Sequence, residues 1–92
     1  MTIVLETWQN TENVAITADI EMQKFCHCID LVISESIDGG PFATTLFRNT
    51  YVDRSSARRA MRNYAKSCCG GSWVKTYDNR TDTRTWADSA PV

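Results

Sequence analysis

The residues best suited to chemistry are four cysteines and one histidine, which occur as Cys-His-Cys at residues 26–28 and as Cys-Cys at residues 68–69. Structural zinc sites usually combine two ligand pairs, each with two to four residues between its members. On a strand, His27 would point away from Cys26 and Cys28, and adjacent residues of a helix diverge by about 100°. The spacing therefore disfavours both a zinc site and a Cys/His nucleophile pair.

No catalytic motif appears elsewhere in the sequence. Nucleophile-elbow, zinc-protease, P-loop and dinucleotide-binding patterns are all missing. The Gly-Gly at 70–71 follows a predicted helix, whereas a phosphate-binding loop precedes one. We therefore expect no enzyme activity, no cofactor, no metal and no small-molecule substrate. The sequence shows neither a secretory signal nor a membrane-spanning run, so we expect free, mostly buried thiols in a reducing compartment.

Positive charge is concentrated around residues 54–66. Residues 1–40 contain one Lys or Arg and seven Asp or Glu, whereas residues 41–92 contain nine and four, so the net charge of -1 conceals a two-signed molecule. An outward-facing arginine cluster suits a phosphate backbone, which arginine binds in a bidentate manner, or an acidic protein surface. The predicted partner-binding residues are Arg48, Asn49, Arg54, Arg58, Arg59, Arg62 and Lys66.

Two alternatives stay open. The acidic strands could neutralise the basic segment within the molecule, in which case the arginines serve the fold. Trp8, Trp73 and Trp86 could stack on nucleic-acid bases, or they could be core and hairpin residues. Acidic residues such as Asp19 and Glu21 on the strands disfavour a sheet that reads DNA, so any nucleic acid should contact the helix side.

The elements that position these residues are an antiparallel sheet and one helix. Residues 13–22 alternate apolar and polar side chains, which predicts a strand with one buried face. Residues 24–37 show the same period, with Phe25 and Ile37 on the apolar face. The predicted strands are 2–8, 13–22, 24–37 and 42–52, joined by turns at 9–12 and 38–41.

In residues 53–71 the apolar and small residues recur at the spacing of a helix rather than that of a strand. Ala57, Ala60, Met61, Tyr64, Ala65 and Cys68 share one face. Asp53 or Ser55 can cap the start, and Gly70–Gly71 can end the helix. The pattern of residues 72–87 predicts a hairpin, and residues 88–92 are expected to form a disordered tail. The fold class is therefore α+β, a single domain over 1–92 in which an antiparallel meander carries one amphipathic helix and a C-terminal hairpin.

This layout resembles the small anti-CRISPR proteins of bacteriophages, in particular inhibitors of type I-F surveillance complexes. The stretches that carry the likeness are ITADIEMQKFCHCIDLVISES, GGPFATTLFRNTYVDRSSARRAMRNYAK and SWVKTYDNR. The resemblance implies an inhibitor in the host bacterial cytoplasm that docks on the CRISPR–Cas ribonucleoprotein, on protein subunits or guide RNA, and blocks target DNA. Such proteins share no common motif, so no residue role is carried over.

The alternative function is a stand-alone nucleic-acid-binding phage protein that uses the basic helix face. Under the inhibitor hypothesis, Arg58→Glu with Arg62→Glu should abolish partner binding and leave thermal stability nearly unchanged. That expectation requires both guanidinium groups to point outward without intramolecular partners.

Overall fold

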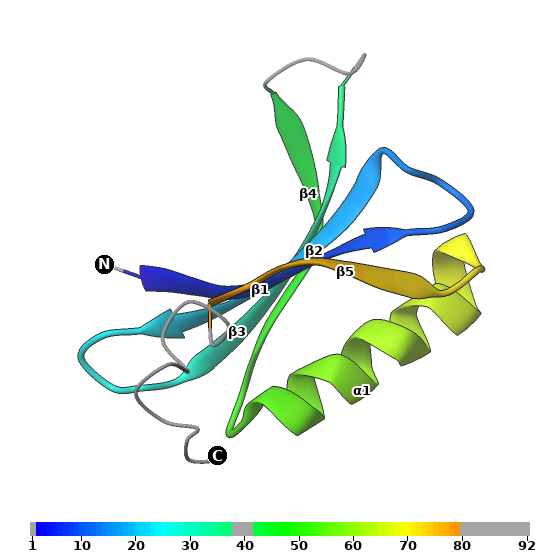
Figure 1. Ribbon diagram of the computed structural model, residues 1–92. Coiled ribbons are helices and arrows are strands. Elements are labelled where there is room, and N and C mark those ends of the chain that lie inside the picture. The colour runs from blue at the N-terminus through cyan, green and yellow to red at the C-terminus, as the bar shows by residue number, and fades with distance from the viewer. Residues whose placement is uncertain (1, 38–41, 80–92) are drawn as a thin grey trace.

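A computed structural model describes residues 2–37 and 42–79, which form a five-stranded antiparallel sheet crossed by one helix (Figure 1). The elements are β1 (Thr2–Asn10), β2 (Ile16–Gln23), β3 (Ile29–Ser36), β4 (Ala43–Tyr51), α1 (Arg54–Tyr64), the π-helical turn η1 (Ala65–Cys69) and β5 (Trp73–Asp78). The strand order is β4-β3-β2-β1-β5. The predicted α+β class, with a meander and a packed helix, is confirmed.

The helix carries the chain from one edge of the sheet to the other. β4 ends at one edge, α1 crosses one face, and β5 pairs antiparallel with β1 at the opposite edge (Figure 1). β5 is the first strand of the predicted C-terminal hairpin, and its described partner is β1. The return strand predicted near 83–86 and the tail at 88–92 lie outside the described residues, as does the predicted turn at 38–41.

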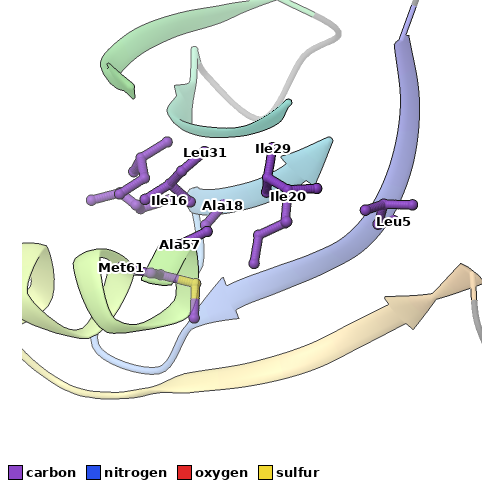
Figure 2. Close-up of a cluster of buried hydrophobic side chains, with 9 residues drawn as sticks. Leu5, Ile16, Ala18, Ile20, Ile29, Leu31, Ala57 and Met61 are labelled. Atoms are coloured by element: carbon purple, nitrogen blue, oxygen red, sulfur yellow. The ribbon is translucent and has the colours of Figure 1, made fainter. Parts of the chain in front are cut away.

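The core lies between α1 and the two central strands. Alternate residues of β2 and β3 point toward the helix, as the period-two pattern predicts. The buried cluster comprises Leu5, Ile16, Ala18, Ile20, Ile29, Leu31, Ile33, Ala57 and Met61. Figure 2 shows Ala57 and Met61 projecting from α1 toward the buried side chains of the sheet. Because Ala57 is small, α1 lies close to the sheet, and Met61 fills the space beside it.

Both ends of the helical segment have the predicted local chemistry. The Asp53 carboxylate accepts a hydrogen bond from the Ser56 amide at 2.8 Å, which satisfies a free donor of the first turn. Gly70 and Gly71 have φ values of 75° and 69°, a left-handed conformation that glycine adopts without a Cβ clash. Neither of the helical segments in the described residues is long and apolar enough to cross a membrane.

The predicted start of the second long strand is wrong. β3 begins at Ile29, and residues 24–28 form the turn after β2. The His27 amide bonds the Gln23 carbonyl at 2.8 Å, and His27 has a left-handed φ of 58°. Phe25, predicted on the buried face, is 95% exposed. The pattern continued through the turn by coincidence, because pairing of Met22 with Ile29 requires a reversal between them.

Candidate functional site

The basic segment is partly neutralised by a buried carboxylate, Glu6. The register of β1 with β2 shifts between Val4, which lies opposite Glu21, and Glu6, which lies opposite Ile20. The extra residue of this bulge turns Glu6 to the helix side of the sheet. Its side chain is fully buried there beneath α1.

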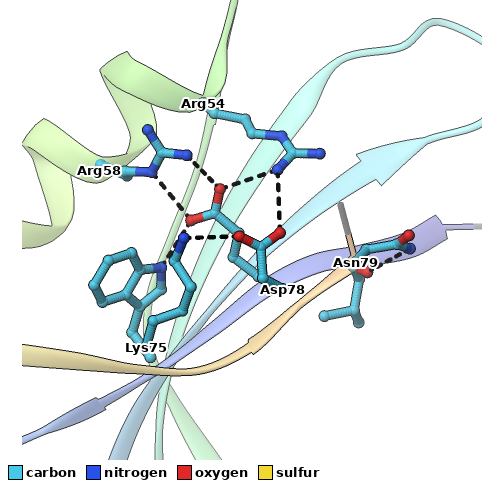
Figure 3. Close-up of polar contacts among 8 residues, drawn as sticks. Arg54, Arg58, Lys75, Asp78 and Asn79 are labelled. Atoms are coloured by element: carbon cyan, nitrogen blue, oxygen red, sulfur yellow. Dashed lines mark hydrogen bonds and ion pairs between the residues drawn. The ribbon is translucent and has the colours of Figure 1, made fainter. Parts of the chain in front are cut away.

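Glu6 accepts four side-chain hydrogen bonds. The Arg58 guanidinium binds it in bidentate fashion, with Nε 3.1 Å from Oε1 and Nη2 2.5 Å from Oε2. Arg54 Nη1 lies 3.1 Å from Oε2, and Trp8 Nε1 donates to Oε1 at 2.9 Å. Figure 3 shows Arg54 and Arg58 reaching from α1 toward the same carboxylate. Arg54 Nη1 also lies 3.9 Å from Asp78 Oδ1. This is a satisfied internal network.

The network determines the ionisation of its members. Burial by itself raises the pKa of Glu6, but the hydrogen bonds from Arg58, Trp8 and Arg54 and the charge of Arg58 together lower it to about 2. The hydrogen bond to Glu6 in turn raises the pKa of Arg58. The Glu6 carboxylate and the Arg58 guanidinium are therefore charged across the physiological pH range.

The expectation that all the helix cations point outward is wrong for Arg54 and Arg58. Their side chains are only 22% and 21% exposed, and each is paired with Glu6. The physical reason is the β1 bulge, which places a carboxylate under two residues one helical turn apart. These two arginines hold the helix on the sheet, the alternative that the sequence left open.

Three of the predicted cations on the helical segment remain exposed. Arg59, Arg62 and Lys66 project from the outer side of the helical segment, and the described residues place no carboxylate in an ion pair with any of them. Arg59 is near enough to the cap Asp53 to contribute to lowering its pKa, after the hydrogen bonds from Ser56. We call Arg59, Arg62 and Lys66 the cationic strip.

Arg48 and Asn49 do not join the cationic strip. Phe47 contacts Tyr64 of α1, with ring centroids 5.7 Å apart, so Phe47 lies on the helix side of β4. Arg48, the next residue, therefore points to the opposite face, where it lies 3.7 Å from Asp30. Asn49 returns to the helix side and donates to the Tyr51 hydroxyl at 3.4 Å.

The face of the sheet away from the helix is acidic. Asp19 and Glu21 alternate there with the buried residues of β2, and Asp30 of β3, which lies opposite Glu21, is itself buried. Burial, followed by the charge of Asp19, raises the pKa of Glu21, although the charge of Arg48 opposes this. Hydrogen bonds from Thr50 and Gln23 lower the pKa of Asp30. The two sides of the molecule thus carry opposite charge.

The cysteines and histidine lie in different surroundings from those expected. Cys26, His27 and Cys28 occupy the turn after β2, where strand alternation does not apply. Cys26 and Cys68 are exposed and the other two thiols are half-buried, so the expectation of mostly buried thiols is wrong. The side-chain hydrogen bond between Cys26 and Cys28 lowers the pKa of Cys26 and raises that of Cys28.

No group of three or more potential metal ligands occurs among residues 2–37 and 42–79. The cysteines at 26–28 and at 68–69 therefore do not contribute to such a group within the described chain.

The sequence reasoning missed Glu6. A single carboxylate inside the apolar stretch 2–8 was the available signal, since a charge on a predicted strand needs a partner if it is buried. Comparison of the chain with protein-family models, curated proteins and solved structures finds no match.

Proposed function

We propose that this protein is a non-enzymatic inhibitor that docks on a CRISPR–Cas ribonucleoprotein surveillance complex and blocks access of target DNA. The observation that carries the proposal is the cationic strip, three exposed side chains that form no ion pair within the described chain. Closely spaced like charges on a helix destabilise it by a few tenths of a kcal/mol when they have no ion-pair partners. Binding of an anionic partner would offset this repulsion.

The opposite charge of the two sides supports a composite partner. A ribonucleoprotein offers RNA phosphates together with basic subunit surfaces that hold DNA. The cationic strip suits the former, and the acidic sheet face with Asp19 and Glu21 suits the latter. The resemblance to type I-F inhibitors points to the same kind of partner. Arg54 and Arg58 are no longer part of the proposed interface, because Glu6 occupies them.

Capture on immobilised type I-F surveillance complex, with free subunits and naked DNA in parallel, tests the proposal. The variant is Lys66→Glu and the matched control is Lys24→Glu, which makes the same charge change in the turn between β2 and β3. We expect Lys66→Glu to weaken capture at least about tenfold and Lys24→Glu to change it little. Both variants should melt within a few degrees of the wild type, because both side chains are exposed.

Three results would refute the proposal. One is failure of the wild-type protein to bind the assembled complex. Another is an equal loss of binding in the two variants, which would show only a general charge effect. The third is binding to naked nucleic acid alone, which would instead support the stand-alone nucleic-acid binder.

A further inference from the structure

An open cleft lies where the end of the helical segment meets β1 and β5. Its volume is about 250 Å³. The lining residues are Trp8, Met61, Arg62, Ala65, Lys66, Gly71, Ser72 and Trp73. This volume is below the roughly 300–1,000 Å³ of pockets that hold drug-sized ligands, so the cleft suits a single ring system.

Two indoles form the apolar part of the cleft, and both are held in place by their N–H groups. Trp73 Nε1 donates to the Met61 carbonyl at 3.1 Å, and Trp8 Nε1 donates to Glu6 at 2.9 Å. Lys75 lies opposite Trp8 in the pairing of β5 with β1, and its Nζ is 5.2 Å from the centroid of the Trp8 ring. Since their polar edges are already used, the rings offer apolar surface that needs no reorganisation before a ligand binds.

Two cations of the cationic strip stand at the rim. Arg62 and Lys66 are four residues apart, so their side chains are neighbours on the helix surface. Lys66 belongs to η1, and π-helical turns are frequent at functional sites. None of the described residues that line the cleft is a carboxylate, although Glu12 lies close to Gly71, where a Cβ on that glycine would be 2.5 Å from Glu12 Cγ. The rim is therefore complementary to an anionic group.

We infer that this cleft binds one nucleotide of a single-stranded nucleic acid, with its base against the indoles and its phosphate between Arg62 and Lys66. A cationic track beside aromatic rings is the combination that proteins use to hold unpaired bases without sequence preference. An acidic peptide would place an aromatic side chain against the two indoles. The phosphate beside a stacked base, however, is the better match for two adjacent cations. The inference deepens the proposed function and rests on it, because Arg62 and Lys66 serve both.

The test uses short oligouridylate and ¹⁵N-labelled protein. We expect the indole N–H signals of Trp8 and Trp73 to shift on titration, since both rings line the cleft. Arg62→Ala and Lys66→Ala should each weaken binding about tenfold. Each should also reduce the slope of log K against log salt by about 0.7, the value for one phosphate contact on a single strand.

Lys24→Ala is the matched control for Lys66→Ala, because Lys24 is an exposed lysine in the turn after β2 and does not line the cleft. It should change affinity less than about threefold. Equal losses in Lys24→Ala and Lys66→Ala, indole signals that do not move, or preferential binding of an acidic tyrosine-containing peptide would each overturn the inference.

The two proposals fail separately. Oligouridylate binding in the cleft without capture of the surveillance complex refutes the proposed inhibitor function and keeps the nucleotide site. Capture of the complex without oligouridylate binding refutes the nucleotide site and keeps the inhibitor function.

Discussion

Glu6→Gln is the substitution that most directly tests the buried ion-pair network. The change keeps the shape of a fully buried side chain that accepts four hydrogen bonds, and removes its charge. Removing one partner of a buried ion pair costs about 3–5 kcal/mol. Arg54 and Arg58 remain 22% and 21% exposed, so water can solvate them in part and the low end, about 3 kcal/mol, is expected.

The lowered pKa of Glu6 gives a similar value for the free energy that its charge contributes to folding. Its lowering from 4.5 to about 2 corresponds to roughly 3 kcal/mol, at 1.36 kcal/mol per unit. Because the pKa in the folded protein lies below that in the unfolded chain, this stability is fully present above about pH 4.5. It is lost as the pH falls toward 2 and Glu6 takes up a proton.

Urea unfolding followed by circular dichroism measures both effects. At pH 7 Glu6→Gln should lower the free energy of unfolding by about 3 kcal/mol, whereas Glu12→Gln, an exposed isosteric control, should change it by less than about 0.5 kcal/mol. Between pH 4.5 and 2 the wild-type protein should lose stability more steeply than the Glu6→Gln variant. A cost below about 1 kcal/mol at pH 7, or parallel acid curves, would refute the reasoning.

Three further substitutions test the fold. Met61→Ala should cost about 2–5 kcal/mol in urea unfolding, because the side chain is 1% exposed beneath the helix, and a loss under about 1 kcal/mol would contradict this packing. Asp53→Ala should cost about 1 kcal/mol through loss of the bond to the Ser56 amide, whereas Asp53→Asn should keep most of it. Gly71→Ala should cost more than about 1 kcal/mol, because φ is 69° and the new Cβ would meet Glu12; unchanged melting would argue against this turn.

Because Arg58 is paired with the buried Glu6, it is not a suitable position for a substitution that tests binding. Arg58→Glu would place a second carboxylate against Glu6, so loss of binding in that variant would report unfolding as much as a lost contact. The expectation that Arg58→Glu with Arg62→Glu spares stability is therefore withdrawn. Exposed Arg62 and Lys66 are the informative positions, with Lys24 as the control.

Much of the fold could be predicted from local patterns. Alternation in 13–22 placed Ile16, Ala18 and Ile20 on one face, although Val14 precedes β2 and is 68% exposed. The helical stripe placed Ala57, Met61 and Ala65 against the sheet. Gly70–Gly71 marked the end of the helix. These succeeded because the period of apolar residues directly reflects which face an element buries. The prediction that Phe25 is buried failed because an apolar residue in a turn can continue the alternating pattern of a neighbouring strand.

The candidate site was predicted only in part, for a physical reason. Composition and helical period determined that positive charge gathers on one helix and negative charge on the strands. Which guanidinium groups are neutralised depends on the one-residue bulge between Val4 and Glu6 and on the pairing of β5 with β1, both contacts between distant parts of the chain. Helical period reports the direction of a side chain on its own helix, whereas a carboxylate partner 52 residues away in the sequence is decided only when the sheet and helix pack together.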